Sequence, residues 1–405
     1  LVLGVYEAKK LRHAGRVGTG FSRVVAEDLY RRLTALERGT SPFADRLDAT
    51  ARRGVRFVKP ELVAEVEFRN WTSDGLLRHA AFRGLREDKP AKEVVREDQA
   101  APAAKSPARV KTKVKLTHPD RIYWKDAGVT KEGLASYYAQ VWRFMAPHVV
   151  SRPLALLRCP GGTAAQCFFQ KHGWKGMSGE ILTVSDPQDD EDKPLIAIDS
   201  LDGLIGLVQG AALEIHPWQA SLDDLERPDQ LVIDLDPGDG VAWSALLDAA
   251  RDVRERLEAA KLAAFVKTTG GKGLHVVAPL KPEAGWDAVK DFARSVAEGM
   301  EADDPKRFIA RATKAARKGR IFVDYLRNGR GATAIAPYAT RAREGATVAM
   351  PLGWDELEPS IGSGHFTVGN AMTRLDNLAS DPWEDFRKAA RPLETETGGR
   401  SRRKK

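Results

Sequence analysis

Cysteine is nearly absent from this chain of 405 residues, which contains only Cys159 and Cys167. Two cysteines supply neither the ligand spacing of a zinc site nor the framework of a disulfide-rich domain, so a reducing cytosol is the expected compartment. The chain also lacks any apolar run of membrane-spanning length, and we expect no signal peptide before Leu1. These absences argue against a membrane-spanning protein and against a small disulfide-stabilised scaffold.

Acidic residues are outnumbered as well, 56 against 64 lysines and arginines, for a formal net charge of +8. That excess suits a polyanionic partner, although many soluble proteins are mildly basic without one. A hydrophobic content of 42% is enough for well-formed cores, and the length predicts two or three domains. Because the chain lacks an initiator methionine and opens inside a strand-like run, we expect a fragment of a longer protein.

The first 90 residues show short strand patterns and one helical pattern. Residues 1–6, 53–57 and 63–68 are expected strands, and an apolar stripe predicts a helix over residues 24–36. Short strands with a single helix suit a small β-barrel such as an OB-fold. Residues 91–113 are then rich in Ala, Pro, Lys and Glu, a composition that predicts an interdomain linker.

Beyond the linker, helical and strand patterns alternate. Thr130 is the expected N-cap of one helix, and further amphipathic helices are expected after residues 243 and 285. Expected strands cover residues 231–235, 263–267, 274–279 and 321–325. The pattern predicts a mixed α and β fold around one central sheet. The acidic run 186–192 is interpreted as a solvated loop.

Two aspartates spaced i, i+2 end the apolar run 231–235 and are followed by Pro-Gly. Side chains alternate faces along a strand, so Asp234 and Asp236 are expected to point the same way. Adjacent carboxylates repel each other unless a cation lies between them, and all-oxygen ligands favour magnesium, manganese or calcium over zinc. An ordinary strand end with solvated acids would show the same pattern, so neighbouring motifs must decide.

Asp324 lies inside a second apolar run, where a lone carboxylate is unfavourable unless a cation is near. Together with Asp234 and Asp236 it makes the usual minimum for two metal ions roughly 3.5–4 Å apart, which clamp the attacking and leaving oxygens of a phosphoryl transfer. The alternative is that Asp324 merely pairs with Arg327 or Arg330.

A glycine-rich turn at residues 268–273 joins two apolar runs. Glycines let backbone N–H groups approach an anion, and Thr269, Lys272 and His275 can add donors for a triphosphate. The turn is not a Walker loop, because Gly273 follows the lysine where that loop has Ser or Thr. Alone it would be an ordinary hairpin, but beside the aspartate pair it indicates a nucleotide site.

Residues 15–21, 66–68 and 77–89 resemble the OB domain of ATP-dependent DNA ligases. The last run resembles the final ligase motif, whose basic residues orient the pyrophosphate of ATP, and Ala80 stands where that family usually has proline. By this resemblance, the role falls to Arg78, Arg86 and Lys89. The nucleotidyltransferase domain with its lysine nucleophile would precede Leu1, so this chain is not expected to ligate alone.

Residues 114 to about 386 resemble the polymerase domain of bacterial ligase D, a member of the archaeo-eukaryotic primase superfamily. The matching motifs are Asp-Leu-Asp-Pro at 234–237, Thr-Thr-Gly-Gly-Lys-Gly-Leu-His at 268–275 and Val-Asp-Tyr-Leu-Arg-Asn at 323–328. The resemblance implies template-dependent nucleotidyl transfer to DNA ends. It also implies that Asp234, Asp236 and Asp324 hold two divalent ions, with Mn²⁺ commonly preferred to Mg²⁺.

The same resemblance implies substrate contacts for residues outside the aspartate triad. The triphosphate of an NTP or dNTP would be held by Thr269, Lys272, His275, Arg317, Arg327 and Arg341. The base would stack on Phe168, the sugar would lie by His216, and a 5′-phosphate of DNA would be bound by Arg121 and Lys131. Taken as residues alone, Phe168 and His216 also suit a core, and Arg317 suits a solvated basic face.

The sequence therefore predicts part of a bacterial end-joining ligase with an OB domain (1–90), a linker (91–113), a primase-type polymerase domain (114–390) and a basic, disordered tail (391–405). Gap filling and end extension, with NTPs favoured, are expected at the nucleoid in the bacterial cytoplasm. Expected partners are DNA ends with gaps or 5′-phosphates and, by resemblance, Ku; we expect a monomer without membrane contact. ATP would serve the longer parent ligase.

Three alternatives remain open from the sequence. The chain could be a DNA-end scaffold with an inactive polymerase, which its basic residues would suit but its intact aspartate triad would not. Its main activity could instead be ATP-dependent ligation by the parent protein. A replicative primase is a variant of the polymerase prediction.

Overall fold

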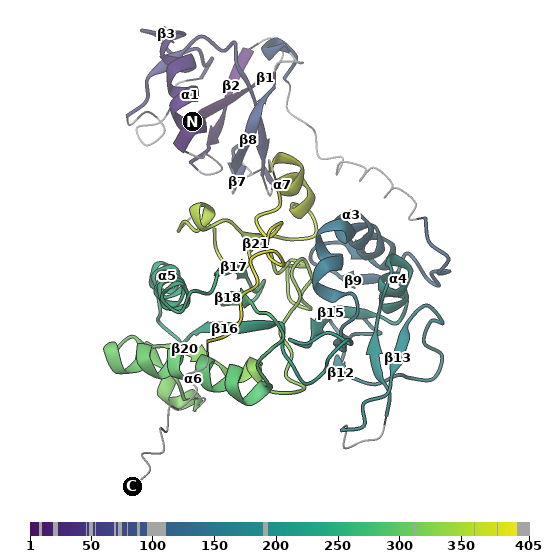
Figure 1. Cartoon of the computed structure of the whole chain (residues 1–405). Coiled ribbons are helices and arrows are strands. Elements are labelled where there is room, and N and C mark those ends of the chain that lie inside the picture. Colours follow the sequence, from purple (N-terminus) through teal and green to yellow (C-terminus); the bar gives the residue numbers. More distant parts are fainter. Residues whose placement is uncertain are drawn as a thin grey trace. The chain divides into compact units, whose positions relative to one another are not determined.

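Short antiparallel strand pairs make up the first of the two units into which the chain divides, residues 1–105 and 106–405 (Figure 1). The computed structural model describes residues 1–7, 10–18, 23–45, 47, 52, 54–68, 70–71, 75–78, 80–86, 90–94, 111–188, 193–311, 313–359, 361–378 and 380–394. None of the helices in these ranges is both long and apolar enough to cross a membrane.

Among its described residues, the first unit contains four strand pairs, helix α1 and a short helix near its end. The pairs are β1 (Val2–Glu7) with β2 (Lys10–Arg16), β3 (Glu37–Arg38) with β4 (Phe57–Val58), β5 (Val63–Glu67) with β8 (Ala81–Arg86), and β6 (Asn70–Trp71) with β7 (Leu77–Arg78). Helix α1 (Arg23–Thr34) packs its buried Leu29 against Val17 and Phe82. These short strands and helix α1 are consistent with the predicted OB-fold.

Both ends of the range predicted as a linker make ordered contacts with a unit. Residues 91–93 form the short helix η1 (Ala91–Glu93), and the amide of Tyr6 in β1 donates a hydrogen bond to the carbonyl of Val94. At the other end, Thr112 donates its hydroxyl proton to the Asp202 carboxylate. Residues 95–110 and the predicted tail from residue 395 onward lie outside the described residues.

The second unit contains two larger sheets. In the five-stranded sheet, β11 (Leu154–Arg158) pairs with β12 (Phe168–Gln170), β14 (Leu195–Ala197) and β15 (Ala212–Pro217), and β14 pairs with β13 (Leu182–Val184). The six-stranded sheet has the order β19 (Phe308–Ile309), β20 (Ile321–Asp324), β16 (Gln230–Pro237), β18 (Leu274–Pro279), β17 (Phe265–Thr268), β21 (Pro351–Leu352). Only β19 and β20 run parallel among the pairs of this sheet.

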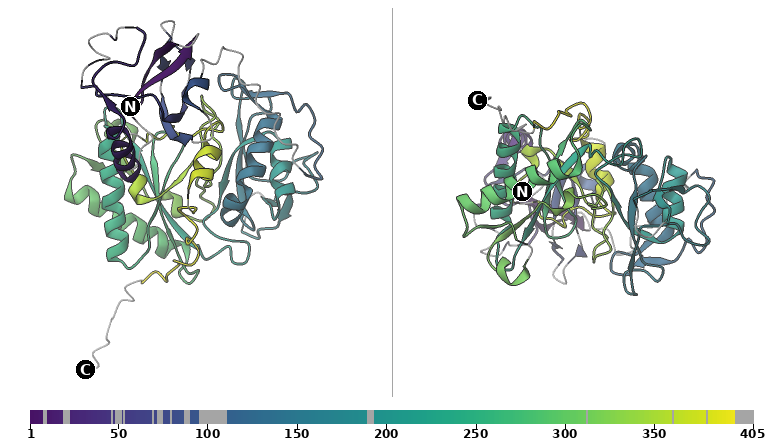
Figure 2. Two further views of the ribbon diagram at one scale, coloured as in Figure 1. Left: turned by 90° about the horizontal axis from the view of Figure 1, so that it is seen from above. Right: turned by 60° about the horizontal axis from the view of Figure 1, so that its bottom comes forward.

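Helices cover one face of each sheet (Figures 1 and 2). Helices α3 (Lys131–Val149) and α4 (Leu201–Gln209) pack together beside the five-stranded sheet, and α5 (Trp243–Ala259) and α6 (Trp286–Asp303) lie along the six-stranded one. Thr130 caps α3 as predicted, because its hydroxyl accepts a hydrogen bond from the Gly133 amide at 3.0 Å. The remaining short elements are β9 (Ile122–Trp124), β10 (Val129–Thr130), η2 (Lys314–Arg317), η3 (Leu326–Asn328), η4 (Trp354–Glu356) and α7 (Ala371–Asn377).

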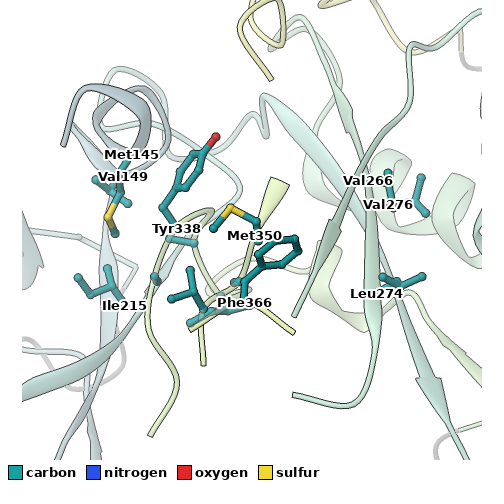
Figure 3. Close-up of a cluster of buried hydrophobic side chains, with 14 of the residues drawn as sticks. Met145, Val149, Ile215, Val266, Leu274, Val276, Tyr338, Met350 and Phe366 are labelled. Carbon is teal, nitrogen blue, oxygen red and sulfur yellow. The ribbon is translucent and has the colours of Figure 1, made fainter. Parts of the chain in front are cut away.

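One continuous hydrophobic core joins the two sheets. Figure 3 shows Tyr338, Met350 and Phe366 between Met145 of α3 and the strand residue Val266 of the six-stranded sheet. All five side chains are buried. The segment after β20 therefore fills the space between the two sheets, so the sheets pack as a single body.

The expectation of a solvated acidic run was wrong at Asp186, and the two cysteines make a contact that the sequence did not predict. Asp186, predicted to be solvated, is buried, and its carboxylate makes two hydrogen bonds of 3.0 and 2.9 Å with Arg330. Arg330 also pairs with Glu226, with Nη2 lying 2.7 Å from a carboxylate oxygen. The two cysteines, which were expected to form neither a zinc site nor a disulfide framework, are joined to each other by one disulfide. Both contacts depend on the tertiary fold, which composition does not report.

The Asp186–Arg330 pair predicts a measurable difference between two neutral substitutions. Asp186→Asn removes the buried carboxylate that makes two hydrogen bonds with Arg330 and leaves that half-buried guanidinium paired only with the exposed Glu226, so we expect the free energy of unfolding to fall by about 2 kcal/mol or more. Glu226→Gln is the matched control, because the Glu226 side chain is 49% exposed; we expect it to change stability by less than about 1 kcal/mol. Denaturant unfolding of the whole chain, followed by tryptophan fluorescence, measures both. Equal losses of unfolding free energy in the two variants would show that the burial of Asp186 does not increase the contribution of its ion pair.

Candidate functional site

Four ionisable side chains lie in one row across the six-stranded sheet. The strand register pairs Lys267 of β17 with His275 of β18, His275 with Asp234 of β16, and Asp234 with Asp324 of β20. Directly opposed residues in antiparallel strands share a face, so the four side chains project from the same side of the sheet. Asp236, two residues beyond Asp234, projects from that side too. The register thus brings the three predicted carboxylates together.

The opposite face of β16 explains why the row stays in place. Ile233 and Leu235 alternate with the two aspartates and are buried in the core together with Leu246 of α5 and Val289 of α6. Slipping the strand by one residue would bury the aspartates in that core and expose both apolar side chains, which is unfavourable. The register is therefore set by the apolar face of the strand.

Asp234 is the most enclosed of the three carboxylates, with only 4% of the residue exposed. Nε and Nη2 of Arg327 each lie 3.2 Å from its Oδ2. Nε2 of His275 lies 3.4 Å from its Oδ1, too poorly placed to donate, so Oδ1 is buried without a hydrogen-bond donor. Burial by itself would raise the pKa of Asp234, but the neighbouring His275 and Arg327 lower it below its ordinary value.

Asp236 and Asp324 carry the opposite perturbation. Burial and the charge of Asp234 raise the pKa of Asp236 to about 6. Burial also raises the pKa of Asp324, although Nε of Arg327 lies 3.5 Å from its carboxylate. Asp324 thus pairs with Arg327, as one alternative allowed, whereas Arg330 is engaged by Asp186 and Glu226. One arginine does not neutralise three clustered acids.

These residues have the chemistry of a divalent metal site. Within the described ranges, no three His, Cys, Asp or Glu side chains are already arranged around one point as metal ligands. The donor set nevertheless fits a hard cation, because it consists of carboxylate oxygens. The unsatisfied Oδ1 of Asp234 and the raised pKa of Asp236 both mark negative charge that a cation would stabilise.

Two glycines let the predicted motifs approach each other closely. A Cβ atom on Gly238, after the aspartate pair, would lie 1.8 Å from the carbonyl oxygen of Arg317. A Cβ on Gly273, in the glycine-rich turn, would lie 2.3 Å from the carbonyl oxygen of Leu235. Both distances are far below contact distance, so these positions require glycine.

Thr269 organises the glycine-rich turn from within. Its hydroxyl accepts hydrogen bonds of 3.2 Å from the amides of Gly271 and Gly273 and donates one of 3.1 Å to the Gly273 carbonyl. The Arg341 guanidinium donates to the Thr269 carbonyl at 2.9 Å. Lys272 is exposed at the tip of the turn, whereas His275 is buried at its base. The turn therefore places Thr269, Arg341 and His275 on one side of the aspartates.

Glu214 is a site residue that the sequence analysis missed. Its buried carboxylate contacts His216 Nε2 at 2.9 Å, accepts the Ala342 amide at 2.9 Å and lies 3.1 Å from Nε of Arg341. Burial would raise the pKa of Glu214, but the His216 hydrogen bond and the Arg341 charge lower it to about 2. Glu214 thus fixes two predicted nucleotide contacts at once. The i, i+2 spacing of Glu214 and His216 on a strand was the available signal.

Lys267 was also missed. It is buried in the row beside His275, and its Nζ has no hydrogen-bond partner. Burial lowers the pKa of Lys267 to about 7, and burial followed by the Lys267 charge lowers the pKa of His275 to about 4. A lysine inside an apolar strand, next to the glycine-rich turn, was the sequence signal.

Phe168 lies on the edge strand β12 and is 42% exposed, so it is not a core residue. The Arg158 guanidinium lies 5.5 Å from the centroid of its ring and 4.0 Å from that of Trp174. Phe169, the next residue, is more exposed and meets the His216 ring edge-on at 5.8 Å. The two phenylalanines present an aromatic surface beside His216.

The predicted 5′-phosphate residues lie close together. Arg121 is exposed, and its guanidinium donates to the Pro160 carbonyl at 3.0 Å. Lys131, in the first turn of α3, donates to the Thr117 carbonyl at 2.9 Å. Burial, and then the charge of Arg121, lower the pKa of Lys131 to about 8. An anion bound beside Arg121 and Lys131 would offset the repulsion between these two positive charges.

The remaining predicted residues differ in what the structure describes. Arg317 ends η2 with its guanidinium 3.8 Å from the centroid of the Phe322 ring, near the aspartates. Arg86 is exposed at the end of β8. The side chain of Arg78 and all of Lys89 lie outside the described residues.

Two family models match the chain. The model described as "LigD, primase-polymerase domain" matches residues 130–383, and "ATP dependent DNA ligase C terminal region" matches residues 1–89. The polymerase domain from Mycobacterium tuberculosis ligase D, solved in complex with DNA, superimposes with a TM-score of 0.64 and 31% identity, covering 69% of this chain and all of that one. This likeness confirms the predicted mixed α and β fold class.

Curated relatives are similar over most of the chain. The multifunctional non-homologous end joining protein LigD of Pseudomonas aeruginosa is 38% identical over 399 residues, which are 95% of this chain and 48% of that protein. Its namesake in Mycolicibacterium smegmatis is 33% identical over 267 residues, 65% of this chain and 35% of the relative. The bifunctional protein LigD of Bacillus subtilis is 29% identical over 279 residues, 68% and 44% respectively. The chain thus spans less than half the length of these relatives.

Clustered carboxylates predict a pH-dependent affinity for Mn²⁺. The pKa of Asp236 is raised to about 6, so protons compete with the metal as the pH falls through that value. We expect the affinity measured by isothermal titration calorimetry to fall roughly tenfold or more between about pH 8 and about pH 5. Asp236→Asn should weaken binding at the higher pH by a similar factor.

Asp239→Asn is the matched control for that measurement. Asp239 is exposed in the turn after β16, and its substitution changes the net charge by the same amount. We expect it to leave the Mn²⁺ affinity within about twofold of the wild-type value, since solvent screens an exposed charge. Equal losses in the two variants would show that the metal responds to overall charge and not to this site.

Proposed function

The chain belongs to the LigD primase-polymerase family, and on that premise we propose that its second unit transfers nucleotidyl groups from NTPs or dNTPs to the 3′-hydroxyl of DNA ends, as directed by a template. Gap filling and extension of broken ends in bacterial non-homologous end joining is the proposed task. NTPs are the proposed preferred substrates.

The observation that carries this proposal is the cluster of three aspartates on one face of the six-stranded sheet. Asp234 and Asp324 oppose each other across β16 and β20, and Asp236 lies on the same face, in a buried setting where Arg327 is the arginine that pairs directly with Asp234 and Asp324. Two divalent ions, Mn²⁺ or Mg²⁺, bound there would lower the pKa of the attacking hydroxyl and stabilise charge on the leaving pyrophosphate. The three aspartates are the proposed ligands of both ions.

The groups around the row suit a nucleoside triphosphate. Arg327, Arg317 and Arg341 supply fixed positive charge, and the glycine-rich turn supplies backbone N–H groups, so a triphosphate would be neutralised and oriented. His275 is buried and neutral near pH 7, which suits a hydrogen-bonding role and not that of a cation. Thr269 shapes the turn, and exposed Lys272 would reach phosphate from solvent.

The base and sugar would bind on the five-stranded sheet. Exposed Phe168 offers an aromatic face on which any base can stack, and such stacking tolerates every sequence. His216, held by Glu214, would lie by the sugar. Sequence would then be chosen by pairing with a template and not by direct recognition of the bases.

DNA with a 5′-phosphate at a gap is the proposed polymer substrate. Arg121 and Lys131 would bind that phosphate, because each donates to a backbone carbonyl, with no carboxylate partner among the described residues, and the two lie close enough to repel each other. The polymerase domain of a relative was solved in complex with DNA, which supports the proposal. Ku, a monomeric state and a place at the bacterial nucleoid in the cytoplasm are likewise proposed.

The first unit is proposed to serve ATP-dependent ligation in the longer parent protein, since it matches the ligase C-terminal region. Arg78, Arg86 and Lys89 would orient the ATP pyrophosphate there. The chain as given contains no Lys-x-Asp-Gly sequence, so it should form no lysyl-adenylate when mixed with labelled ATP.

Primer extension tests the proposed polymerase activity. A labelled primer–template with a 5′-phosphorylated gap, Mn²⁺ and single NTPs or dNTPs should yield templated addition by the wild-type chain. Asp236→Ala should lower the rate on the order of a thousandfold, because the proposed metal site would lose one of its three carboxylates. The exposed Asp239→Asn variant should extend the primer at the wild-type rate.

Loss of addition in the wild type under every metal would favour the alternative of a DNA-end scaffold. That outcome combined with tight binding of gapped DNA would support the scaffold over a misfolded protein. Synthesis of a dinucleotide without a primer would instead identify a primase.

A further inference from the structure

The Cys159–Cys167 disulfide cross-links the hairpin of β11 and β12, and Phe168 is the first residue of β12. In β11 and β12 the last paired residues are Arg158 and Phe168, so the two cysteines are the next residues along each strand. Cys159 is fully buried, whereas Cys167 is partly exposed and immediately precedes Phe168. The disulfide therefore closes the loop 160–166 and fixes the first residue of a three-residue edge strand.

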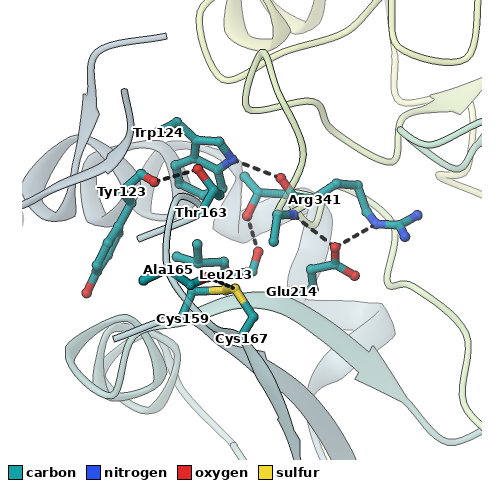
Figure 4. Close-up of a disulfide and its surroundings, with 11 residues drawn as sticks. Tyr123, Trp124, Cys159, Thr163, Ala165, Cys167, Leu213, Glu214 and Arg341 are labelled. Carbon is teal, nitrogen blue, oxygen red and sulfur yellow. Dashed lines mark hydrogen bonds and ion pairs between the residues drawn. A yellow bond between two sulfur atoms is a disulfide. The ribbon is translucent and has the colours of Figure 1, made fainter. Parts of the chain in front are cut away.

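The loop 160–166 also contacts the predicted 5′-phosphate site. The Arg121 guanidinium donates to the carbonyl of Pro160, inside the loop, at 3.0 Å. Thr163 donates to the Tyr123 carbonyl through its amide at 2.8 Å and through its hydroxyl at 3.0 Å (Figure 4). A Cβ on Gly162 would lie 2.9 Å from the same carbonyl oxygen, so the loop packs directly on β9.

Strand β9 connects the loop to Arg341, one of the residues proposed to bind the triphosphate. Figure 4 shows the indole of Trp124 donating to the Arg341 carbonyl, at 3.1 Å, beside the ion pair of Arg341 with Glu214. The loop thus contacts, directly or through β9, groups proposed to bind the 5′-phosphate, the base and the triphosphate. No other covalent link among the described residues joins them.

We propose that Cys159 and Cys167 form a reversible thiol–disulfide site whose oxidation state sets how firmly Phe168 and Arg121 are positioned for substrate. The inference rests on the proposed function, because a bacterial DNA-repair enzyme works among thiol reductants, where a disulfide that forms is usually transient or redox-sensing. In the disulfide form the loop is closed and both groups are ordered. In the dithiol form the edge strand and loop gain conformational freedom.

A dithiol is the class of reductant that such a site would take. Its thiolate attacks Sγ of Cys167, the more exposed sulfur, which breaks the S–S bond and releases Cys159 as a thiolate that takes up a proton. The second thiol of the reductant then displaces Cys167, which leaves as a thiolate and is protonated. Two electrons and two protons pass to the cysteine pair, and the reductant becomes a cyclic disulfide.

The test compares the whole chain equilibrated with reduced or oxidised dithiothreitol. Alkylation followed by mass spectrometry counts the free thiols, and primer extension on gapped DNA gives KM for the NTP. We expect the reduced protein to show a KM about three- to tenfold higher, equivalent to losing roughly one base-stacking contact. The preference for a 5′-phosphate over a 5′-hydroxyl at the gap should weaken as well.

The double variant C159A/C167A is the matched control. It cannot form the bond, so its KM and its 5′-phosphate preference should equal those of the reduced wild type under both conditions. Thermal melting separates this effect from unfolding. The variant must be folded at the assay temperature and must melt in one transition above it. A single variant, C167A, leaves the buried Cys159 in place and should behave like the double variant.

Two results would overturn the inference, and neither would touch the proposed function. One is two alkylatable thiols in the oxidised sample, which would show that the bond does not form. The other is an active enzyme with the same KM and the same phosphate preference in both redox states. Absence of extension by every form would instead refute the proposed polymerase activity, and thiol counting would still report on the bond.

Discussion

Repulsion among carboxylates on one face of a sheet is the constraint on which this site depends. Asp234 and Asp324 oppose each other, and Asp236 follows on the same side, so ionising each acid makes the next harder to ionise. Strand β16 is bonded to β18 on one side and β20 on the other, so the acids cannot move apart. Arg327 offsets part of the repulsion, and the remainder appears as the raised pKa of Asp236.

Alternation along β16 could be predicted from the sequence because it is a local property of the chain. Which residue opposes Asp234 could not, because Asp324 is 90 residues away and the pairing depends on register. The same reason hid Glu214, whose partner Arg341 is distant, and Asp186, whose partner Arg330 is 144 residues away. Resemblance to a family supplied a role for Asp324 but none for Glu214 or Asp186, and it supplied none of the contacts that hold these residues.

The burial of Asp186 and the disulfide between the two cysteines were not predicted, and for the same reason. An acidic run in a sequence suggests solvent, yet only Asp186 of that run needed to find one guanidinium for its burial to become favourable. Two cysteines likewise suggest no framework, because spacing alone does not show that a hairpin brings them opposite each other. In both cases the decisive fact was a tertiary neighbour, and neither residue type nor local pattern encodes it.

Arg327 pairs with the carboxylates and is also one of the arginines proposed to contact a triphosphate. It lies 3.2 Å from Asp234 and 3.5 Å from Asp324. A dication bound to the acids would release the guanidinium, and a triphosphate would supply the negative charge that then attracts it. A metal ion alone would leave Arg327 without its acidic partners, and a triphosphate alone would leave the buried acids without a cation. If both ligands bind as proposed, charge balance would couple metal binding to nucleotide binding, and Arg327 would pair with the acids in their absence.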